Sequence, residues 1–415
     1  TQERPDFPDS IELEDDASAE MGATIRWGMT PNITLSGAIN PDFSQVEADA
    51  VQLAINERFA LFFEERRPFF LEGADYFNTG LNLLYTRVVA DPLAALKVTG
   101  KVGRHTVGVF SALDEVTNLI VPGPEGSSSG GFEQQNLSTV GRYRYDLGAG
   151  STVGTMITDR QGSDGYFNRV ASVDGVIRPS SADSISFDLA FSRTAYSLEM
   201  QEEFDATGDV LEDHGARIEY VRTNRNWFAF VEYMDFGDDF RADLGFIPRV
   251  GYREGNTGAG YIWWGDGDHW YNRLEAGGFL RRTEQQDGEL LSDAAELWLD
   301  AALPLQTFVH MELGQHTEVS EGVRFDNLFV PALFVRSQPS ATVDLRLGIV
   351  GGDWVDFDNL QPADRMRVNF DLGLNIGRHF DLELKHLYSR LDVDGGTLFE
   401  ANVPQVWAVW QFNTR

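Results

Sequence analysis

The stretch RMRVNFDLGLNIG, residues 365–377, decides how this chain folds. Its side chains alternate between apolar and polar with a period of two, which is the pattern of a β-strand with one apolar face. The apolar face carries Met366, Val368, Phe370, Leu372, Leu374 and Ile376, and the polar face carries Arg365, Arg367, Asn369, Asp371 and Asn375. About six repeats exceed the length of strands usual in soluble proteins. The stretch therefore predicts a long strand with one face against oil and the other against water.

Other segments repeat this alternation, and each is about as long as the 9–11 residues that a tilted strand needs to cross a bilayer. They are residues 183–192, 293–303, 340–350 and 379–388. Short turns at 30–32, 148–150 and 224–226 alternate with long polar loops at 114–136, 199–213 and 282–293. This asymmetry is typical of outer-membrane barrels. We expect an all-β, transmembrane antiparallel β-barrel of about 18–20 strands over residues 21–415, after an N-terminal tail or first partial strand at 1–20.

Composition supports this class and excludes others. The 415 residues carry 65 acidic and 33 basic side chains, a net charge of −32 and no cysteine. Nucleic acid is excluded as a partner because neutralising phosphates requires clustered Lys and Arg. Disulfides and thiolate metal sites are excluded as well. In a membrane barrel, apolar lipid-facing residues and polar lumen-facing residues offset one another in the mean hydropathy. The aromatic content of 12% and the 41 glycines are consistent with this class.

Aromatic residues mark the ends of the expected strands. The C-terminal stretch PQVWAVWQFNTR places Val406, Ala408, Trp410 and Phe412 on one face, and it resembles the signal that bacterial assembly machinery recognises in outer-membrane barrels. Tyr261, Trp263, Trp264 and Trp270 cluster where a membrane-interface girdle would lie. A soluble β-sandwich or propeller is the alternative, although the sequence has no repeat of blade length.

About fifty residues after Asn40 interrupt the regular alternation of strands and connecting loops. A connection of this length indicates a functional or a disordered segment. The composition favours order, because phenylalanines supply apolar surface and acidic and basic residues supply both signs of charge. Large barrel interiors are polar and are either filled or left open. The sequence therefore predicts a plug-like lumen insertion at residues 41–82.

Three stretches of this region resemble a bacterial family of outer-membrane β-barrels that usually lie C-terminal to a family-9-like carbohydrate-binding domain. They are WGMTPNITLSGAINPDFSQVEAD (27–49), RFALFFEERRPFFLEGADYF (58–77) and LKVTGKVGRHTVGVF (96–110). FRADLGFIPRVGYR (240–253) also fits, so the resemblance covers residues from about 21 to 253. It implies a multi-pass protein of the Gram-negative outer membrane. The glycan function of the carbohydrate-binding domain does not carry over, because the matching motifs are those of the barrel.

The resemblance and the local composition together identify candidate plug or gating residues. They are Asn40, Asp42, Phe43, Gln45, Glu47, Asp49, Glu65, Arg66, Arg67, Phe69, Phe70 and Glu72. Arg66 or Arg67 is expected to pair with Glu47, Asp49 or Glu72 inside the lumen, since bidentate arginine–carboxylate pairs fix one register. Two interpretations stay open: a salt-bridge network that locks the fold, and a ligand or gating site.

The motifs in the sequence that could form a catalytic or metal site do not include a convincing group of catalytic residues. GSSSG (126–130) matches the nucleophile-elbow pattern without its strand-turn-helix context. His310, Glu312 and His316 share one strand face, but they span too much length for one metal ion, so we expect lumen-lining side chains. Weak candidates for calcium in external loops are Asp266, Asp268, Asp353, Asp356 and Asp358, none of which belongs to a full twelve-residue calcium loop.

These expectations favour a plugged or gated channel for passage or docking of small solutes or glycans. An acidic lumen would favour cations or neutral solutes over anions. The alternatives are a barrel anchor for a periplasmic carbohydrate-binding domain or partner protein, and a glycan-acting enzyme. The expected partners are outer-membrane lipid and a periplasmic or surface protein, and no cofactor other than calcium is expected.

Overall fold

One large antiparallel sheet makes up most of the molecule. The computed structural model describes residues 22–41, 55–377 and 379–412. The sheet contains nineteen strands. They are β1 (Ala23–Thr30), β2 (Ile33–Ile39), β3 (Pro92–Val102), β4 (His105–Asp114), β7 (Asn136–Gly148), β8 (Ser151–Gly162), β9 (Phe167–Ile177), β10 (Asp183–Ala195), β11 (Leu211–Thr223), β12 (Trp227–Phe236), β13 (Tyr252–Trp264), β14 (Arg273–Gln285), β15 (Leu290–Leu303), β16 (Thr307–Ser320), β17 (Val323–Ser340), β18 (Val343–Asp356), β19 (Gln361–Ile376), β20 (Phe380–Val393) and β21 (Gly396–Trp410).

The remaining elements are short and lie in the connections. β5 (Thr117–Pro122) and β6 (Ser127–Phe132) form a separate hairpin, and α2 (Leu198–Phe204) follows β10. The connection from β2 to β3 holds α1 (Pro68–Leu71) and two 3-10 helices, η1 (Ala74–Phe77) and η2 (Thr86–Val88). Among the described residues, none of the helices combines the length and the apolar character needed to span a lipid bilayer.

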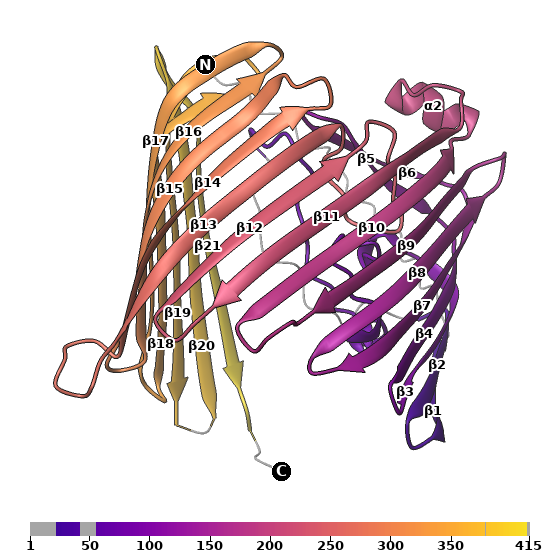
Figure 1. The fold of residues 1–415 in the computed structure, drawn as a ribbon, viewed down its shortest axis with the longest axis horizontal. Coiled ribbons are helices and arrows are strands. Elements are labelled where there is room, and N and C mark those ends of the chain that lie inside the picture. The colour runs from indigo at the N-terminus through magenta and orange to yellow at the C-terminus, as the bar shows by residue number, and fades with distance from the viewer. Residues whose placement is uncertain (1–21, 42–54, 378, 413–415) are drawn as a thin grey trace, which may run out of the picture.

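The strands follow one another around the sheet in chain order. Each pairs antiparallel with the next, and β4 pairs with β7 across the β5–β6 hairpin. Figure 1 shows the sheet as a curved wall, with β14–β21 on one side and β1–β4 on the other, and β1 and β21 as its two edges. This architecture confirms the predicted all-β antiparallel barrel class, and nineteen strands lie within the predicted range.

The two faces of the sheet differ as the sequence predicts. On the outward face, Ile157, Phe191 and Leu297 are 59%, 58% and 65% exposed. Such a belt of exposed apolar residues is suited to contact with lipid chains. The inward face carries charged pairs, for example Arg217 on β11 with Glu232 on β12 at 2.5 Å. The alternation of period two therefore separates a lipid-facing surface from a polar interior.

The inward face is covered unevenly. Strands β3, β4 and β7–β10, here called the filled wall, bury inward residues such as Phe110, Val140 and Met156 beneath the β2–β3 connection. Strands β12–β20, here called the open wall, leave many inward residues exposed or half-buried, among them Arg346 and Asn369. Most of the hydrophobic core of the protein therefore lies on one side of the interior.

Candidate functional site

The candidate site is built around residues 55–91, here called the inner segment, which lies against the inward face of the sheet. β2 ends at Ile39, and Asn40 adopts a positive φ of 40° that asparagine tolerates better than most residues. The Asn40 amide donates to the carbonyl of Leu93 at 2.8 Å. The chain thus leaves the wall at Asn40 and rejoins it at β3. The candidate residues Asp42, Phe43, Gln45, Glu47 and Asp49 lie outside the described residues.

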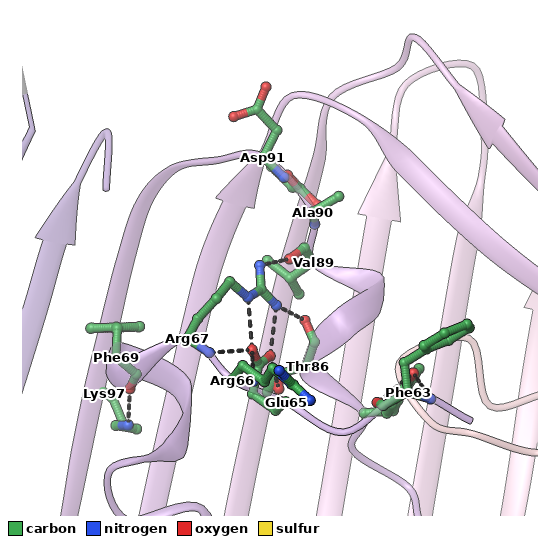
Figure 2. Close-up of polar contacts among 12 residues, drawn as sticks. Phe63, Glu65, Arg66, Arg67, Phe69, Thr86, Val89, Ala90, Asp91 and Lys97 are labelled. Carbon is green, nitrogen blue, oxygen red and sulfur yellow. Dashed lines mark hydrogen bonds and ion pairs between the residues drawn. The ribbon is translucent and has the colours of Figure 1, made fainter. Parts of the chain in front are cut away.

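Arg67 is the centre of the inner segment (Figure 2). Its Nε and one terminal nitrogen donate to the two carboxylate oxygens of Glu65 at 2.9 and 2.7 Å. The guanidinium also donates to the carbonyls of Val89 and Thr86, both at 2.7 Å, and it lies 4.1 Å from the ring centroid of Phe70. Arg67 is only 6% exposed. Its charge is therefore satisfied within the protein, and it joins the middle of the inner segment to residues 86–89 near its C-terminal end.

Glu65 is fixed as a charged acceptor. Besides Arg67, its carboxylate accepts from Oγ1 of Thr86 at 2.7 Å and from the backbone amide of Arg66 at 3.0 Å. Burial favours the neutral acid, but the hydrogen bonds from Arg67 and Thr86 outweigh burial and hold the pKa of Glu65 below its ordinary value. The Glu65 carboxylate is therefore ionised at neutral pH.

The short helix α1 is fixed to the filled wall and to the edge strand. Pro68 occupies its first turn, where no backbone donor is needed. Lys97 of β3 donates its ammonium group to the carbonyl of Phe69 at 2.5 Å and to that of Glu72. The Glu72 side chain pairs with Arg26 of β1. The sequence suggested Glu72 as a partner for Arg66 or Arg67, whereas the structure pairs Arg67 with Glu65 and Glu72 with Arg26.

Aromatic packing completes this contact. Phe69 and Phe70 meet edge to face at 5.2 Å, and Phe70 meets Phe110 of β4 at 6.0 Å. A Cβ on Gly108 would lie 2.9 Å from the ring of Phe77, so the absence of a side chain lets this ring lie against the wall. The candidate residues Phe69 and Phe70 are thus part of the buried core, 8% and 3% exposed.

The inner segment also spans the interior from one wall to the other. On the open wall, Arg58 donates to Glu318 of β16 at 2.8 Å, and Glu57 pairs with Arg367 of β19 at 2.5 Å. On the filled wall, the Gly80 amide donates to Asp188 of β10 at 2.8 Å. Contacts with both walls give one segment the means to restrict the space between them.

A further anchor, Arg160 of β8, was not among the predicted residues. It is completely buried and contacts all three segments that fold inward. Its guanidinium donates to Asn118 of the β5–β6 hairpin at 2.8 Å, to Asp243 in the β12–β13 connection at 3.2 Å and to Val88 of the inner segment at 3.4 Å, each time at the carbonyl oxygen. The signal in the sequence was an arginine at an inward position of a strand.

The β12–β13 connection, residues 237–251, is a second inward segment. Its Leu244 carbonyl accepts from the amide of Tyr85 at 2.6 Å, and the Asn82 carbonyl accepts from the amide of Phe246 at 2.9 Å. Asp243 is 3% exposed and accepts from the hydroxyl of Tyr166 at 2.8 Å. Burial raises the pKa of Asp243 above its ordinary value, although Tyr166 and Arg160 oppose this shift. The motif FRADLGFIPRVGYR therefore belongs to the same packed body as the inner segment.

A cavity of about 730 Å³ lies between the inner segment and the β5–β6 hairpin. Phe59, Phe63 and Tyr85 line one side, and Ser127 and Ser129 line the other. Ser127 is also fixed by the inner segment, because its Oγ accepts from the amide of Ala60 at 2.6 Å. GSSSG therefore forms part of a β-hairpin, in keeping with the missing nucleophile-elbow context.

The expected metal candidates are dispersed over several loops and strand ends. Asp266 lies 2.6 Å from Nδ1 of His269 and accepts from the amide of Asp268. Asp353 accepts from the amide of Phe329, and Asp356 accepts from the side chains of Asn359 and Gln361. Asp358 follows in the turn after β18. Within the described ranges, no group of three or more His, Asp or Glu side chains is placed to hold a metal ion.

The histidines of β16 line the interior, each beside acidic side chains. Nδ1 of His310 lies 2.7 Å from Asp300, and Nε2 of His310 lies 3.3 Å from Glu312. His316 lies three inward-facing positions beyond His310 on the same strand, and its Nε2 is 3.7 Å from Glu296. These positions agree with the expected lumen-lining role.

Comparison with known proteins gives a partial family match and distant structural likenesses. The family model described as "Domain of unknown function (DUF5916)" matches residues 8–98. No curated protein matches the chain. Among solved structures, OccAB2 of Acinetobacter baumannii is 11% identical with a TM-score of 0.43, covering 78% of this chain and 94% of that one. OccK7 (OpdD) of Pseudomonas aeruginosa is 10% identical with a TM-score of 0.45, covering 76% and 91%. At these TM-scores the likeness assigns no activity.

Proposed function

We propose that this protein is an outer-membrane β-barrel channel whose interior is narrowed by the inner segment, as part of a lumen insertion that begins near residue 41. It serves passage or docking of small solutes or glycans. The many carboxylates of the protein, with a net charge of −32, favour cationic or neutral solutes over anions.

One observation carries this proposal. The inner segment bridges the two walls through Arg58–Glu318 and Gly80–Asp188, and Arg160 joins it to both other inward segments. A segment needed only to stabilise the filled wall would gain nothing from ion pairs to the open wall. The two ion pairs to the open wall differ in burial: the side chains of Arg58 and Glu318 are 15% and 17% exposed, whereas those of Arg367 and Glu57 are 31% and 29% exposed, so the second pair contributes only about 0–1 kcal/mol.

Conductance in planar bilayers tests the proposal. We expect the full chain to show small or intermittent currents, and a chain with residues 41–82 replaced by a glycine-serine linker to show steady currents several times larger. Heat-modifiable migration on a gel confirms that both chains are folded. Equal steady currents from two folded chains would contradict a restricting role for the insertion, and no current from either would contradict a channel.

A further inference from the structure

The open wall carries a row of aromatic side chains that the inner segment does not need for its packing. Phe228 and Phe230 of β12, Phe279 of β14 and Trp298 of β15 share the inward face with Glu232, which pairs with Arg217 beside Asp188. Their rings are half-buried. We call these four residues the aromatic platform. A ring that remains partly exposed inside a polar lumen is available to a ligand.

Glycines let these rings lie flat against the wall. Phe228 is paired across the strands with Gly260, and Phe230 with Gly258. A Cβ on either glycine would lie 2.7 Å from the facing ring, so any larger residue would push the ring away from the wall. Trp298 covers Gly277 in the same way. These glycines therefore leave the space that the aromatic rings occupy, and they do not form turns.

Three of the rings lie close together. The centroids of Phe228 and Trp298 are 6.2 Å apart with their planes inclined by 25°, and those of Phe279 and Trp298 are 6.3 Å apart with an inclination of 40°. These three rings lie side by side on the same inward face of the sheet and form a shallow floor. A cage for an organic cation would instead need rings that surround the charge from several sides.

Hydrogen-bonding groups border this floor. Glu312 lies directly across the strands from Trp298, and His310 lies across from Asp300. The Glu312 and Asp300 side chains are 30% and 19% exposed. On the other side, Glu275 accepts from Nε1 of Trp298 at 3.3 Å and pairs with Arg273. A ligand on the platform would therefore meet carboxylate acceptors next to apolar ring faces.

From this combination we infer that the aromatic platform, with Glu312 and Asp300, binds neutral saccharide units inside the lumen. A pyranose ring presents a flat apolar face that stacks on an aromatic ring and hydroxyl groups that donate to carboxylates at its edge. A neutral sugar also meets no repulsion from the acidic protein. This inference rests on the proposed channel function and names the solute class of that channel.

Equilibrium binding to the full chain, folded in detergent micelles, tests the inference with a neutral linear glucose hexasaccharide as the probe. We expect the native sequence to bind it, Trp298→Ala to weaken the affinity at least about tenfold, and Trp298→Phe to retain most of it. Trp263→Ala is the matched control, since Trp263 lies on the outward face and is 44% exposed; it should leave the affinity unchanged. Heat-modifiable migration checks that each variant is folded, and Phe228→Leu replaces Trp298→Ala if that variant does not fold.

Three results would overturn the inference: no hexasaccharide binding by the native sequence, equal affinities for Trp298→Ala and Trp263→Ala, or loss of tetraethylammonium binding without loss of saccharide binding in Trp298→Ala. Currents in bilayers without sugar separate these results from the channel proposal. A chain that conducts but binds no hexasaccharide refutes only the platform. A chain that binds the hexasaccharide through Trp298 but never conducts refutes only the channel.

Discussion

The filled wall and the open wall follow the same pattern of alternation and differ in what covers their inward faces. On the filled wall, Phe110, Val140 and Arg160 are 1%, 0% and 0% exposed, because the inner segment, the β5–β6 hairpin and residues 237–251 pack on them. On the open wall, the Arg346 side chain is 54% exposed and Asn369 is also exposed. One wall therefore holds the inner segment, while the other leaves polar inward side chains exposed.

The largest expected effect comes from Arg67→Ala, which removes the charge that compensates Glu65. Breaking a buried ion pair on one side costs about 3–5 kcal/mol, since the remaining carboxylate stays desolvated. We expect the inner segment to detach from the filled wall, a lower midpoint for urea unfolding of the chain folded in detergent, and larger currents. Unchanged unfolding and unchanged currents would mean that Arg67 does not fix the segment.

Arg160→Ala should have the next largest effect, because it leaves the carbonyls of Asn118, Asp243 and Val88 without this donor. Hydrogen bonds from a charged donor contribute about 1.5–3 kcal/mol each at most, and partial relaxation reduces the sum. The matched change on the open wall is Arg346→Ala, because the Arg346 side chain is 54% exposed and lies 3.4 Å from its partner Asp344; it should cost less than about 1 kcal/mol. Equal losses of stability for the two variants would contradict the difference in packing between the filled wall and the open wall.

Acid should loosen the inner segment in a graded way. The pKa of Glu65 is held below its ordinary value in the folded protein, so its ion pair stabilises the fold above the unfolded pKa, near 4.5, and this contribution is lost as the pH falls through the folded pKa. Pepsin cleavage or hydrogen exchange within residues 55–91 should therefore increase below about pH 4. Glu65→Gln should show the faster exchange already at pH 7 and a flatter pH dependence; an identical profile for both chains would exclude Glu65 as the titrating group.

The strands were predictable because lipid on one side and water on the other impose a period of two on every crossing segment. The residues 365–377 show this most clearly, and they form β19 almost as expected. The lumen insertion at residues 41–82 stays a prediction, which rests on about fifty residues rich in phenylalanine and in both charges that have no place in a hairpin turn. Its described part, 55–91, extends beyond the predicted end at residue 82.

The detailed contacts were not predictable, for two physical reasons. Arg67 pairs with a residue two positions away because the Glu65 carboxylate also accepts from the backbone amides of Arg66 and Arg67, and composition does not reveal such local geometry. Arg160 joins segments that lie 42, 72 and 83 positions away in the chain, which meet only after the sheet has formed. The aromatic platform was hidden because its rings and the glycines beneath them lie on different strands.

Solvent access to single cysteines tests the contrast between the walls most directly, because the native chain has no cysteine. Ser172→Cys places a thiol on the inward face of the filled wall, and Asn369→Cys places one on the inward face of the open wall. With a polar, membrane-impermeant thiol reagent, we predict rapid labelling at position 369 and slow labelling at position 172, with the latter accelerated when residues 41–82 are replaced by a linker. Equal labelling of the two positions in the full chain, or protection of position 172 that survives this replacement, would contradict the account.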